Sequence, residues 1–368
     1  MLATTWKRQT GIGIDLGTEA IKLVELRKQG AGYQVLSALR MATPQGAVTD
    51  GTIANPAALA ARLGEMVASG NYRRRPVVTT IGGRKVISRH IRVPVMPEKE
   101  LDSAVKWEAE RYLPFGNQEL VMDYLNLGEV EAEGKKQLSI LVAAVPAEVA
   151  RAYYNAFLAA QLELVVIDIV PAALVRWAGS MGNLMPANGS YALVDLGAEM
   201  GNLVISSNRQ VAFARTIPMG GNLLTEAVAR ALGINLHEAQ RVKEEEARLF
   251  EDSVNARHNR EQEGLDETAA AMSRVDSALK DALSDLVREI RRSMDFYRTQ
   301  SPNSPVGRVV LTGGTSLLPG LDRYLAQELD LPVEVGNTVV MGNAHYPGLL
   351  DAGYALAAGL ALRGVMPY

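Results

Sequence analysis

The chain contains two stretches in which hydrophobic and polar positions follow the same order. In residues 11–26 an apolar run ends in Asp-Leu-Gly, a turn of small residues follows, and a second apolar run begins. Residues 191–205 repeat this order, and both stretches have a glutamate two residues after the glycine. Each stretch is typical of a β-hairpin with a tight turn. Because Asp15 and Asp195 lie 180 residues apart (195 − 15), we expect two related halves that close on one ligand.

The remaining apolar positions predict further strands and helices. The clearest helix spans 275–297, where seven apolar residues are separated by three or four positions. We interpret this stripe as a buried helix face rather than a coiled-coil seam, because it covers only about three heptads. Other helices are expected at 56–68, with Asn55 as cap, at 97–113 and at 147–161, and strands at 33–39, 77–81, 86–93, 138–144 and 165–171.

A third element with candidate chemistry is an apolar strand followed by Thr-Gly-Gly-Thr-Ser-Leu-Leu-Pro-Gly-Leu, over residues 308–321. Glycines at a strand end let the backbone approach a flat ligand closely. In the two hairpins, exposed N–H groups of the turn can cradle a phosphate, and an aspartate at the strand end can hold a cation through water. The alternative for Asp15 and Asp195 is an ordinary strand-end turn without a ligand.

Together with a small-residue helix at 354–362, these elements resemble the actin/heat-shock-protein/sugar-kinase ATPase superfamily. Its five motifs, called phosphate 1, connect 1, phosphate 2, adenosine and connect 2, are all found here in order. The resemblance implies ATP and Mg²⁺ as cofactors, with Mg²⁺ held by Asp15 and Asp195, mostly through water. For Lys243 and Glu246 an exposed helix pair without a ligand is the alternative. The expected nucleotide-binding residues are Asp15, Gly17, Thr18, Glu19, Lys22, Asp195, Gly197, Ala198, Gly221, Asn222, Lys243, Glu246, Gly313, Gly314 and Ser316.

Hydrolysis of ATP would require a residue that positions water in line with the γ-phosphate. The candidates for this catalytic role are Asp168, Glu19 and Glu199. Asp168 ends the connect 1 strand, where the superfamily often keeps such a residue, but the glutamine of actin is absent. We therefore expect ATP binding with at most slow hydrolysis, and a nucleotide that acts mainly as a conformational ligand.

Composition narrows the function classes further. The chain has 368 residues, of which 48% are hydrophobic and 21% charged, an ordinary globular mix large enough for two domains. The net charge of −3 gives no case for a nucleic-acid partner. The absence of cysteine excludes disulfides, thiolate metal sites and a cysteine nucleophile. No apolar run reaches about 18 residues and no signal peptide precedes the first strand, so we expect a cytoplasmic location.

The segment between the first hairpin and the strand at 165–171 indicates which family within this superfamily the chain resembles. The motifs Val-Pro-Val-Met-Pro at 93–97, Trp-Glu-Ala-Glu-Arg-Tyr-Leu-Pro-Phe at 107–115 and Ala-Val-Pro at 144–146 closely resemble the type IV pilus assembly protein PilM family, which is related to the cell-division FtsA family. The resemblance covers nearly the whole chain. It implies an ATP-binding adaptor of the pilus assembly platform, peripheral to the inner membrane, which docks the N-terminal cytoplasmic tail of the bitopic protein PilN.

In that family the tail lies in a groove between the first domain and an inserted subdomain. The matching apolar positions are Val86, Ile91, Val93, Val95, Trp107, Tyr112 and Phe115, and core packing is the alternative for each. Residues 73–92 hold seven Lys or Arg and no acid, so this block could face an acidic partner or a membrane surface. Its alternative is a solvated strand face with balancing acids elsewhere.

We therefore expect an α/β protein with an actin-like (ribonuclease H-like) two-lobed ATPase fold and an inserted α+β subdomain in the first lobe. Two other functions stay open: an FtsA-like or MreB-like filament or membrane-scaffold protein that self-associates, and a small-molecule kinase. FtsA relatives carry an amphipathic membrane helix after the counterpart of the 354–362 helix, and we do not expect such a helix here. The expected division is 1–75 first-lobe core, 76–162 inserted subdomain, 163–188 return to the first lobe, 189–220 second-lobe core, 221–300 helical subdomain, 301–340 second-lobe core with the adenosine loop, and 341–368 C-terminal helix in the first lobe.

Overall fold

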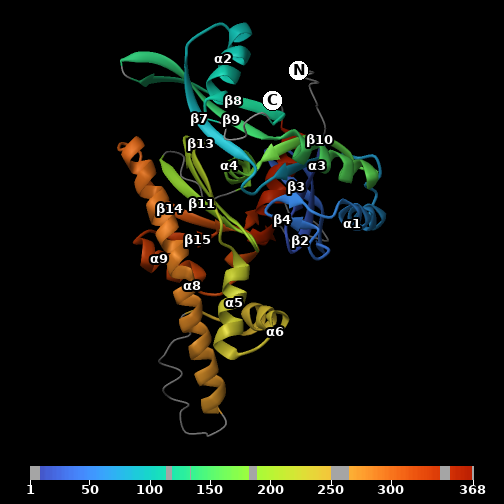
Figure 1. The fold of residues 1–368 in the computed structure, drawn as a ribbon, viewed down its shortest axis with the longest axis vertical. Helices are drawn as coiled ribbons and strands as arrows, with labels where there is room; N and C mark the ends of the chain where they lie inside the picture. The colour runs from blue at the N-terminus through green and yellow to red at the C-terminus, as the bar shows by residue number, and fades with distance from the viewer. Residues whose placement is uncertain are drawn as a thin grey trace.

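Two five-stranded sheets with the same topology form the centre of the molecule (Figure 1). The computed structural model describes residues 9–112, 118–132, 134–181, 189–249, 265–339 and 349–366. The first sheet has the order β10-β6-β1-β2-β3, made of β10 (Glu163–Ile169), β6 (Pro76–Ile81), β1 (Thr10–Leu16), β2 (Ala20–Gln29) and β3 (Gly32–Ala42). The second has the order β13-β12-β11-β14-β15, made of β13 (Gln210–Ile217), β12 (Gly201–Ser207), β11 (Ser190–Leu196), β14 (Val306–Thr312) and β15 (Val333–Val335).

The register of the sheets confirms the internal repeat. β1 pairs antiparallel with β2 and places Asp15 opposite Lys22, while β11 pairs antiparallel with β12 and places Asp195 opposite Asn202. Each of these hairpins then has a parallel neighbour, β6 beside β1 and β14 beside β11. The two Asp-Leu-Gly sequences therefore end equivalent central strands, and the expected actin-like fold is confirmed.

Helix α10 (Ala355–Val365), close to the end of the chain, packs against β1 of the first lobe. The approach is possible because Gly11 and Gly13 present no side chain, so the helix backbone lies directly on the strand. Next to α10, α4 (Val170–Met181) contributes the fully buried Trp177, whose indole N–H donates to Thr338 Oγ1 at 2.8 Å. A single core cluster here contains residues of both sheets, such as Val24 and Leu193, so the two lobes share a hydrophobic centre.

The second lobe carries a set of helices that lie beside its sheet and extend below it in the view of Figure 1. The stripe predicted for 275–297 is confirmed, because Val275, Leu279, Leu283 and Ile290 are buried. The helix begins ten residues earlier than predicted (275 − 265), since alanines at 269–271 favour helix without needing a buried face. The helices are α5 (Gly221–Leu232), α6 (Leu236–Arg241), a π-helix (Val242–Glu246), α8 (Leu265–Gln300) and α9 (Leu321–Leu329).

A separate three-stranded sheet of order β7-β9-β8 lies at the top of Figure 1, with α2 on one of its faces. β6 pairs with both β1 and β10 in the first-lobe sheet, and α3 packs against α1, so the predicted unit 76–162 is wider than this sheet and its helix. Strand β8 is an addition to the predicted elements. These elements are β7 (Ile87–Pro94), α2 (Glu98–Glu110), β8 (Leu120–Ala132), β9 (Lys135–Pro146), α3 (Ala147–Ala159) and α1 (Pro56–Ala68).

Several short elements complete the described chain. Asn55 caps α1 as predicted, because its side chain accepts from the Ala58 N–H. None of the described helices is both long and apolar enough to cross a bilayer. The short elements are β4 (Val48–Thr49), β5 (Thr52–Ile53), β16 (Thr338–Val339), β17 (Leu349–Leu350) and 3₁₀ turns at Gly314–Leu317 and Ala352–Tyr354.

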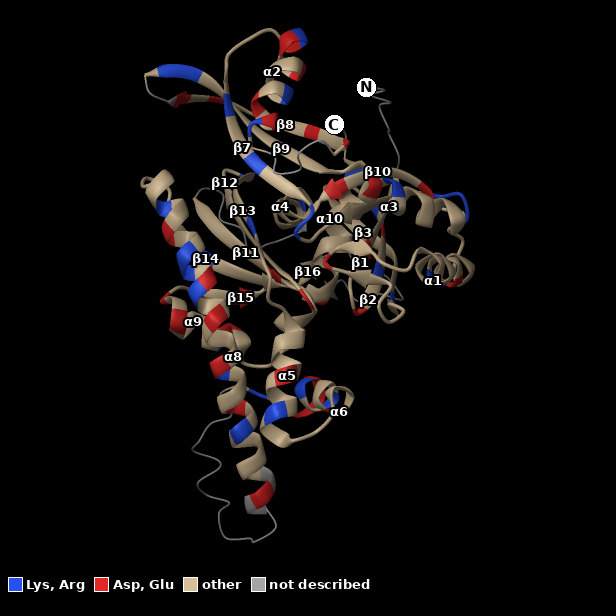
Figure 2. Cartoon of the chain, viewed as in Figure 1, with Lys and Arg blue, Asp and Glu red and all other residues tan. Residues whose placement is uncertain are grey.

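The basic block at 73–92 meets acids and rings from other parts of the chain. Arg75 pairs with Glu25 at 2.7 Å, Arg84 pairs with Asp50 at 2.9 Å, and Arg89 lies over the ring of Tyr112 at 5.0 Å. Figure 2 shows further positive positions along β7 and at the outer end of the β8–β9 hairpin. The contacts favour the alternative of a strand face balanced by acids elsewhere.

Candidate nucleotide site

A cleft of about 350 Å³ lies between the lobes and is lined by both Asp-Leu-Gly turns. This volume is within the usual range of small-molecule sites, about 300–1,000 Å³. The cleft is also lined by the loop that follows β14 and by the start of α5. The predicted residues that meet around it are Asp15, Gly17, Thr18, Glu19, Lys22, Asp195, Gly197, Ala198, Glu199, Gly221, Asn222, Lys243, Gly313 and Gly314.

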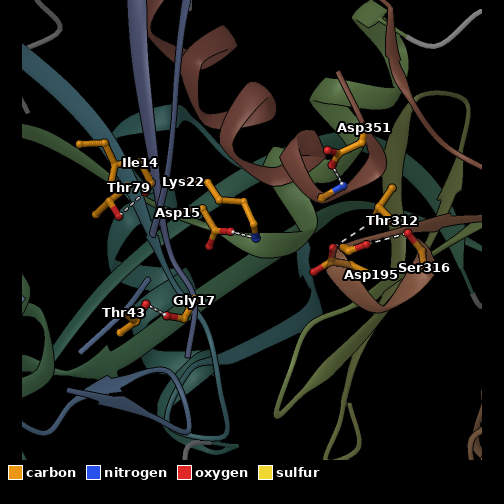
Figure 3. Close-up of polar contacts among 12 residues, drawn as sticks. Ile14, Asp15, Gly17, Lys22, Thr43, Thr79, Asp195, Thr312, Ser316 and Asp351 are labelled. Atoms are coloured by element: carbon orange, nitrogen blue, oxygen red, sulfur yellow. Dashed lines mark hydrogen bonds and ion pairs between the residues drawn. The ribbon is translucent and has the colours of Figure 1, made fainter. Parts of the chain in front are cut away.

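The two turns of the cleft are held in the same way. The N–H of Gly17 donates to Ala20 O at 3.1 Å, and that of Gly197 donates to Met200 O at 3.0 Å. A threonine hydroxyl then fixes each glycine carbonyl. Thr43 donates to Gly17 O at 2.7 Å, as Figure 3 shows, and Thr315 donates to Gly197 O at 2.8 Å. Bonds from outside each hairpin therefore hold both turns in a defined shape before a ligand arrives.

The two aspartates face the cleft from opposite lobes (Figure 3). Asp15 pairs with Lys22 Nζ at 3.2 Å, and Asp195 Oδ1 accepts from the Thr312 hydroxyl at 3.0 Å. Burial and the like charge of Asp15 raise the pKa of Asp195, while Lys22 and the hydrogen bonds of Thr312 and Asn202 oppose that rise. A buried carboxylate whose charge is disfavoured by burial and by a second carboxylate nearby fits a cation shared by the two.

Glu199 joins the two lobes. Its Oε2 accepts from the Thr18 hydroxyl at 3.2 Å and from the backbone N–H of Asp50 at 2.9 Å. Glu199 belongs to the turn of the second lobe, whereas Thr18 and Asp50 belong to the first lobe. This carboxylate is therefore placed to respond to any change in the distance between the lobes. The other predicted glutamate, Glu19, lines the cleft and is exposed.

Lys243 reaches the cleft from the π-helix and is buried. Its Nζ donates to Gly221 O at 3.1 Å and to the side-chain oxygens of Thr225 and Gln240, both at 2.8 Å. Burial lowers the pKa of Lys243, and the carboxylates of Glu244 and Glu19 oppose this effect. A buried cation whose hydrogen bonds go to uncharged oxygens fits an anionic ligand. π-Helical turns often occur at functional sites.

The first backbone N–H groups of α5 already have hydrogen-bond partners in the protein. The N–H of Gly221 donates to Gly197 O at 2.9 Å, and that of Asn222 donates to Ala198 O at 2.7 Å. These bonds tie the helix to the second Asp-Leu-Gly turn, and an added Cβ at Gly220 would lie 2.6 Å from Ala198 O. A contribution of Asn222 to ligand binding is therefore expected from its side chain, because its backbone N–H is already bonded to Ala198 O.

The glycine of the adenosine-type loop is required by its position. Gly313 has a φ of 85°, and a Cβ there would lie 2.4 Å from Leu196 O. Ser316 is buried and donates to Gly313 O at 2.6 Å, so it shapes the loop and does not line the cleft. Its neighbour Thr315 lines the cleft instead. Glu246 also lies outside the lining, where it pairs with Arg241 at 3.1 Å.

Asp168 is not brought to the cleft. Its carboxylate pairs with Arg176 of α4 at 2.9 Å, with both side chains largely buried, and Arg176 also donates to Gly359 O of α10 at 3.0 Å. The expectation that Asp168 orients a catalytic water is corrected by this placement. The strand does end beside the site, since Thr80 donates to the backbone oxygen of Asp168 and itself lines the cleft, but the side chain is directed to the α4–α10 contact.

We therefore predict that Asp168→Asn lowers stability and leaves nucleotide affinity unchanged. Removing one partner of a largely buried ion pair leaves Arg176 without its counter-charge, at a cost of about 3 kcal/mol. Urea unfolding and titration with a fluorescent nucleotide measure the two quantities separately. The matched control is Asp295→Asn, which removes an exposed pair with Arg298 on α8. A large loss of nucleotide affinity without a loss of stability would mean that Asp168 does contribute to the nucleotide site.

Sequence reasoning missed several lining residues. Tyr153 is buried on the helix predicted at 147–161 and is among the residues that line the cleft. The dipeptide Asp50-Gly51 carries a turn signal, but no local pattern indicates that the turn lies beside Glu199. Gln240 and Glu244 lie one helical turn from each other, and their side chains are hydrogen-bonded.

The predicted partner-binding residues fall into two groups. Ile91 and Val93 are buried in the core of the inserted sheet, and Val86 packs at the edge of the first-lobe core. Val95, Trp107 and Tyr112 are exposed, with 66% of Trp107 accessible and the guanidinium of Arg111 over its ring at 5.7 Å. Phe115 lies outside the described residues.

Within the described ranges, no three His, Cys, Asp or Glu side chains are close enough to hold a metal by themselves. Two carboxylates that face one cleft fit a cation that is also ligated by phosphate and water, as Mg²⁺ bound to a nucleotide is. The buried like-charged pair Asp15 and Asp195 and the buried cation Lys243 supply the complementary charges.

Comparisons with known proteins agree with the expected fold and family. A family model described as type IV pilus assembly protein PilM matches residues 13–254, and one described as cell division protein FtsA matches residues 192–359. A solved structure described as a PilM-PilN type IV pilus biogenesis complex is 31% identical with a TM-score of 0.79, covering 98% of this chain and 100% of the other. An ADP-bound MreB5 of Spiroplasma citri, 13% identical with a TM-score of 0.55 over 96% of this chain and 95% of the other, shares the fold.

Curated relatives match over a shorter region. The cell division protein FtsA of Bacillus subtilis is 29% identical over 183 residues, which are 47% of this chain and 38% of the relative. The FtsA of Neisseria meningitidis is 25% identical over 48% of this chain and 44% of the relative. The chain spans less than half the length of the curated relatives it matches.

Proposed function

The chain belongs to the type IV pilus assembly protein PilM family, and from this premise we propose that it is a nucleotide-dependent adaptor of the pilus assembly platform. In this proposal it binds Mg·ATP between its lobes and docks the N-terminal cytoplasmic tail of a PilN-type membrane protein. The observation that carries the proposal is the convergence of two equivalent Asp-Leu-Gly turns on one cleft. The PilM-PilN complex supports the choice of partner.

The residues of the cleft divide the proposed work. Asp15 and Asp195 hold Mg²⁺, mostly through water. The N–H groups of Gly17 and Gly197 are bonded within their turns, so the backbone N–H groups of Thr18 and Ala198 are proposed to contact phosphate oxygens. Lys243 supplies a positive charge from the π-helix, and Gly313 and Gly314 back the base. Mg²⁺ neutralises the phosphate charge when it is bound. With Asp168 paired to Arg176, Glu19 and Glu199 stay as candidates for orienting water, and slow hydrolysis is the expectation.

Docking of the tail is proposed at the exposed part of the predicted surface. Val95, Trp107 and Tyr112 are accessible, whereas Ile91 and Val93 stabilise the subdomain from within. Exposed aromatic side chains are frequent anchors of protein interfaces. A cytoplasmic protein bound in this way would lie at the inner membrane through its partner.

The proposal predicts that a synthetic peptide of the PilN tail binds the full chain and that Mg·ATP changes its affinity at least about fivefold. Trp107→Ala should lower the affinity for the peptide about 30-fold, because truncation of an interface anchor costs about 2 kcal/mol of binding free energy. Isothermal titration calorimetry with and without Mg·ATP measures both effects. Phe296→Ala, which removes an exposed aromatic ring of α8, is the matched control.

Two outcomes would contradict the adaptor. Absence of peptide binding in both nucleotide conditions would reject the docking function. Formation of a sedimentable polymer on addition of Mg·ATP, without peptide binding, would favour the filament function of FtsA-like and MreB-like relatives instead.

A further inference from the structure

The turn Asp50-Gly51 contacts three parts of the molecule that are far apart in sequence. It connects β4 to β5, and its residues have φ values of 48° and 65°, as a type I′ turn requires. Gly51 lines the nucleotide cleft. The turn is therefore a fixed, tight structure at the edge of the site.

The first contact joins the turn to the second lobe. The backbone N–H of Asp50 donates to Glu199 Oε2 at 2.9 Å, and the Thr18 hydroxyl donates to the same oxygen at 3.2 Å. Glu199 follows directly on the second Asp-Leu-Gly turn. A displacement of the second lobe against the first consequently acts on Asp50.

The second contact joins the turn to the segment that leads into the inserted subdomain. The Asp50 carboxylate accepts from Arg84 N at 3.1 Å and from Arg84 Nε at 2.9 Å. The backbones also touch: a Cβ on Gly51 would lie 2.3 Å from Gly82 O, and one on Gly83 would lie 2.0 Å from Asp50 O. Since no side chain separates turn and linker, a shift of the turn displaces the linker between β6 and β7.

The third contact joins the turn to the segment that leads back out of the subdomain. The Tyr153 hydroxyl of α3 donates to Gly51 O at 2.8 Å, and the side chain is buried. β9 passes directly into α3 at Pro146 and Ala147. Both chain crossings between the first lobe and the inserted subdomain thus meet the same two-residue turn.

We propose that Asp50 is a positioning residue that couples the arrangement of the lobes at the nucleotide cleft to the inserted subdomain, through Glu199 on one side and Arg84 on the other. The inference rests on the proposed function for its consequence, which is that nucleotide occupancy and tail binding influence each other. Coupling of this kind typically changes an affinity about 5- to 150-fold, and the change is the same in both directions.

The test compares coupling rather than affinity. The full chain is titrated with Mg·ATP and with the PilN tail peptide, each alone and in the presence of the other. Asp50→Asn keeps a residue that tolerates positive φ and keeps the N–H bonded to Glu199, but it removes the charge that holds Arg84. We expect Asp50→Asn and Arg84→Gln to keep each separate affinity within about threefold while the coupling factor falls from at least about five toward one. Arg298→Gln, which removes an exposed ion pair of α8, should keep the wild-type factor.

If Asp50 had a merely structural role, Asp50→Asn would weaken the binding of both ligands and leave the coupling factor at its wild-type value. That result would overturn the proposal. A second measurement needs neither ligand. Hydrogen exchange of amides in Ile87–Pro94 should become severalfold faster in Glu199→Ala and stay unchanged in Glu226→Ala, an exposed glutamate of α5. Unchanged exchange in Glu199→Ala would also overturn the proposal. If the wild-type chain binds neither ligand, the proposed function fails, and the exchange result alone decides on the coupling through Asp50.

Discussion

Gly13→Ala is expected to destabilise the protein by about 3 kcal/mol or more, since overpacking that displaces backbone lies at the upper end of such effects. An added Cβ would lie 2.1 Å from Ala357 O, 2.4 Å from Ala361 N and 2.7 Å from Leu360 Cβ. Two of these atoms are backbone, so no side chain can rotate away. The strand and α10 would have to separate, which opens the core that the two lobes share.

The matched control makes the same chemical change with the opposite expected sign. Gly64 lies inside α1, and a Cβ there would meet nothing within 4 Å. Alanine in a helix interior is more stable than glycine by about 0.5–1 kcal/mol, so Gly64→Ala should raise the free energy of unfolding. Urea unfolding followed by circular dichroism measures both variants. Equal stability of Gly13→Ala and the wild-type chain would show that α10 does not press on β1 in solution.

The hairpins and the longest helix could be predicted because their signals are local. Asp15 and Asp195 follow apolar strands directly, and the stripe from Val275 to Tyr297 needs only the 3.6-residue period. The repeat then indicated that both aspartates belong to one site, although each hairpin alone is a weak signal. The type of fold therefore followed from short stretches and their recurrence.

The contacts that sequence reasoning missed depend on pairing across the fold. β6 has the same strand signal whether it joins the inserted sheet or the first-lobe sheet, and only its pairing with β1 and β10 decides. Asp168 ends a strand near the site, but the long side chain of Arg176 reaches its carboxylate from α4. Tertiary packing decides which charged side chains pair, and the local sequence pattern does not indicate these partners.

Asp195→Asn is expected to lower the affinity for Mg·ATP about 100-fold and to stabilise the ligand-free protein. Loss of one member of a buried charge contact costs about 2–5 kcal/mol of binding free energy, which covers this factor. In the ligand-free chain the same carboxylate is unfavourable, because burial and the charge of Asp15 raise its pKa. The amide of asparagine removes the repulsion and can still accept from the Thr312 hydroxyl.

The sign of the pH dependence follows from the raised pKa. The pKa of the Asp195 side chain is near 3.8 in the unfolded chain and higher in the folded chain, so the folded chain holds this proton more tightly. As the pH rises from about 3.8 through the folded pKa, this group therefore lowers the free energy of unfolding. Asp195→Asn should therefore melt higher than the wild-type chain at pH 7, and the difference should narrow as the pH is lowered. Thermal melts across pH, with Asp295→Asn as an exposed control, test this dependence. A ligand-free variant that melts lower than wild type at pH 7 would mean that Asp195 stabilises its lobe, and the case for a cation shared with Asp15 would lose its main support.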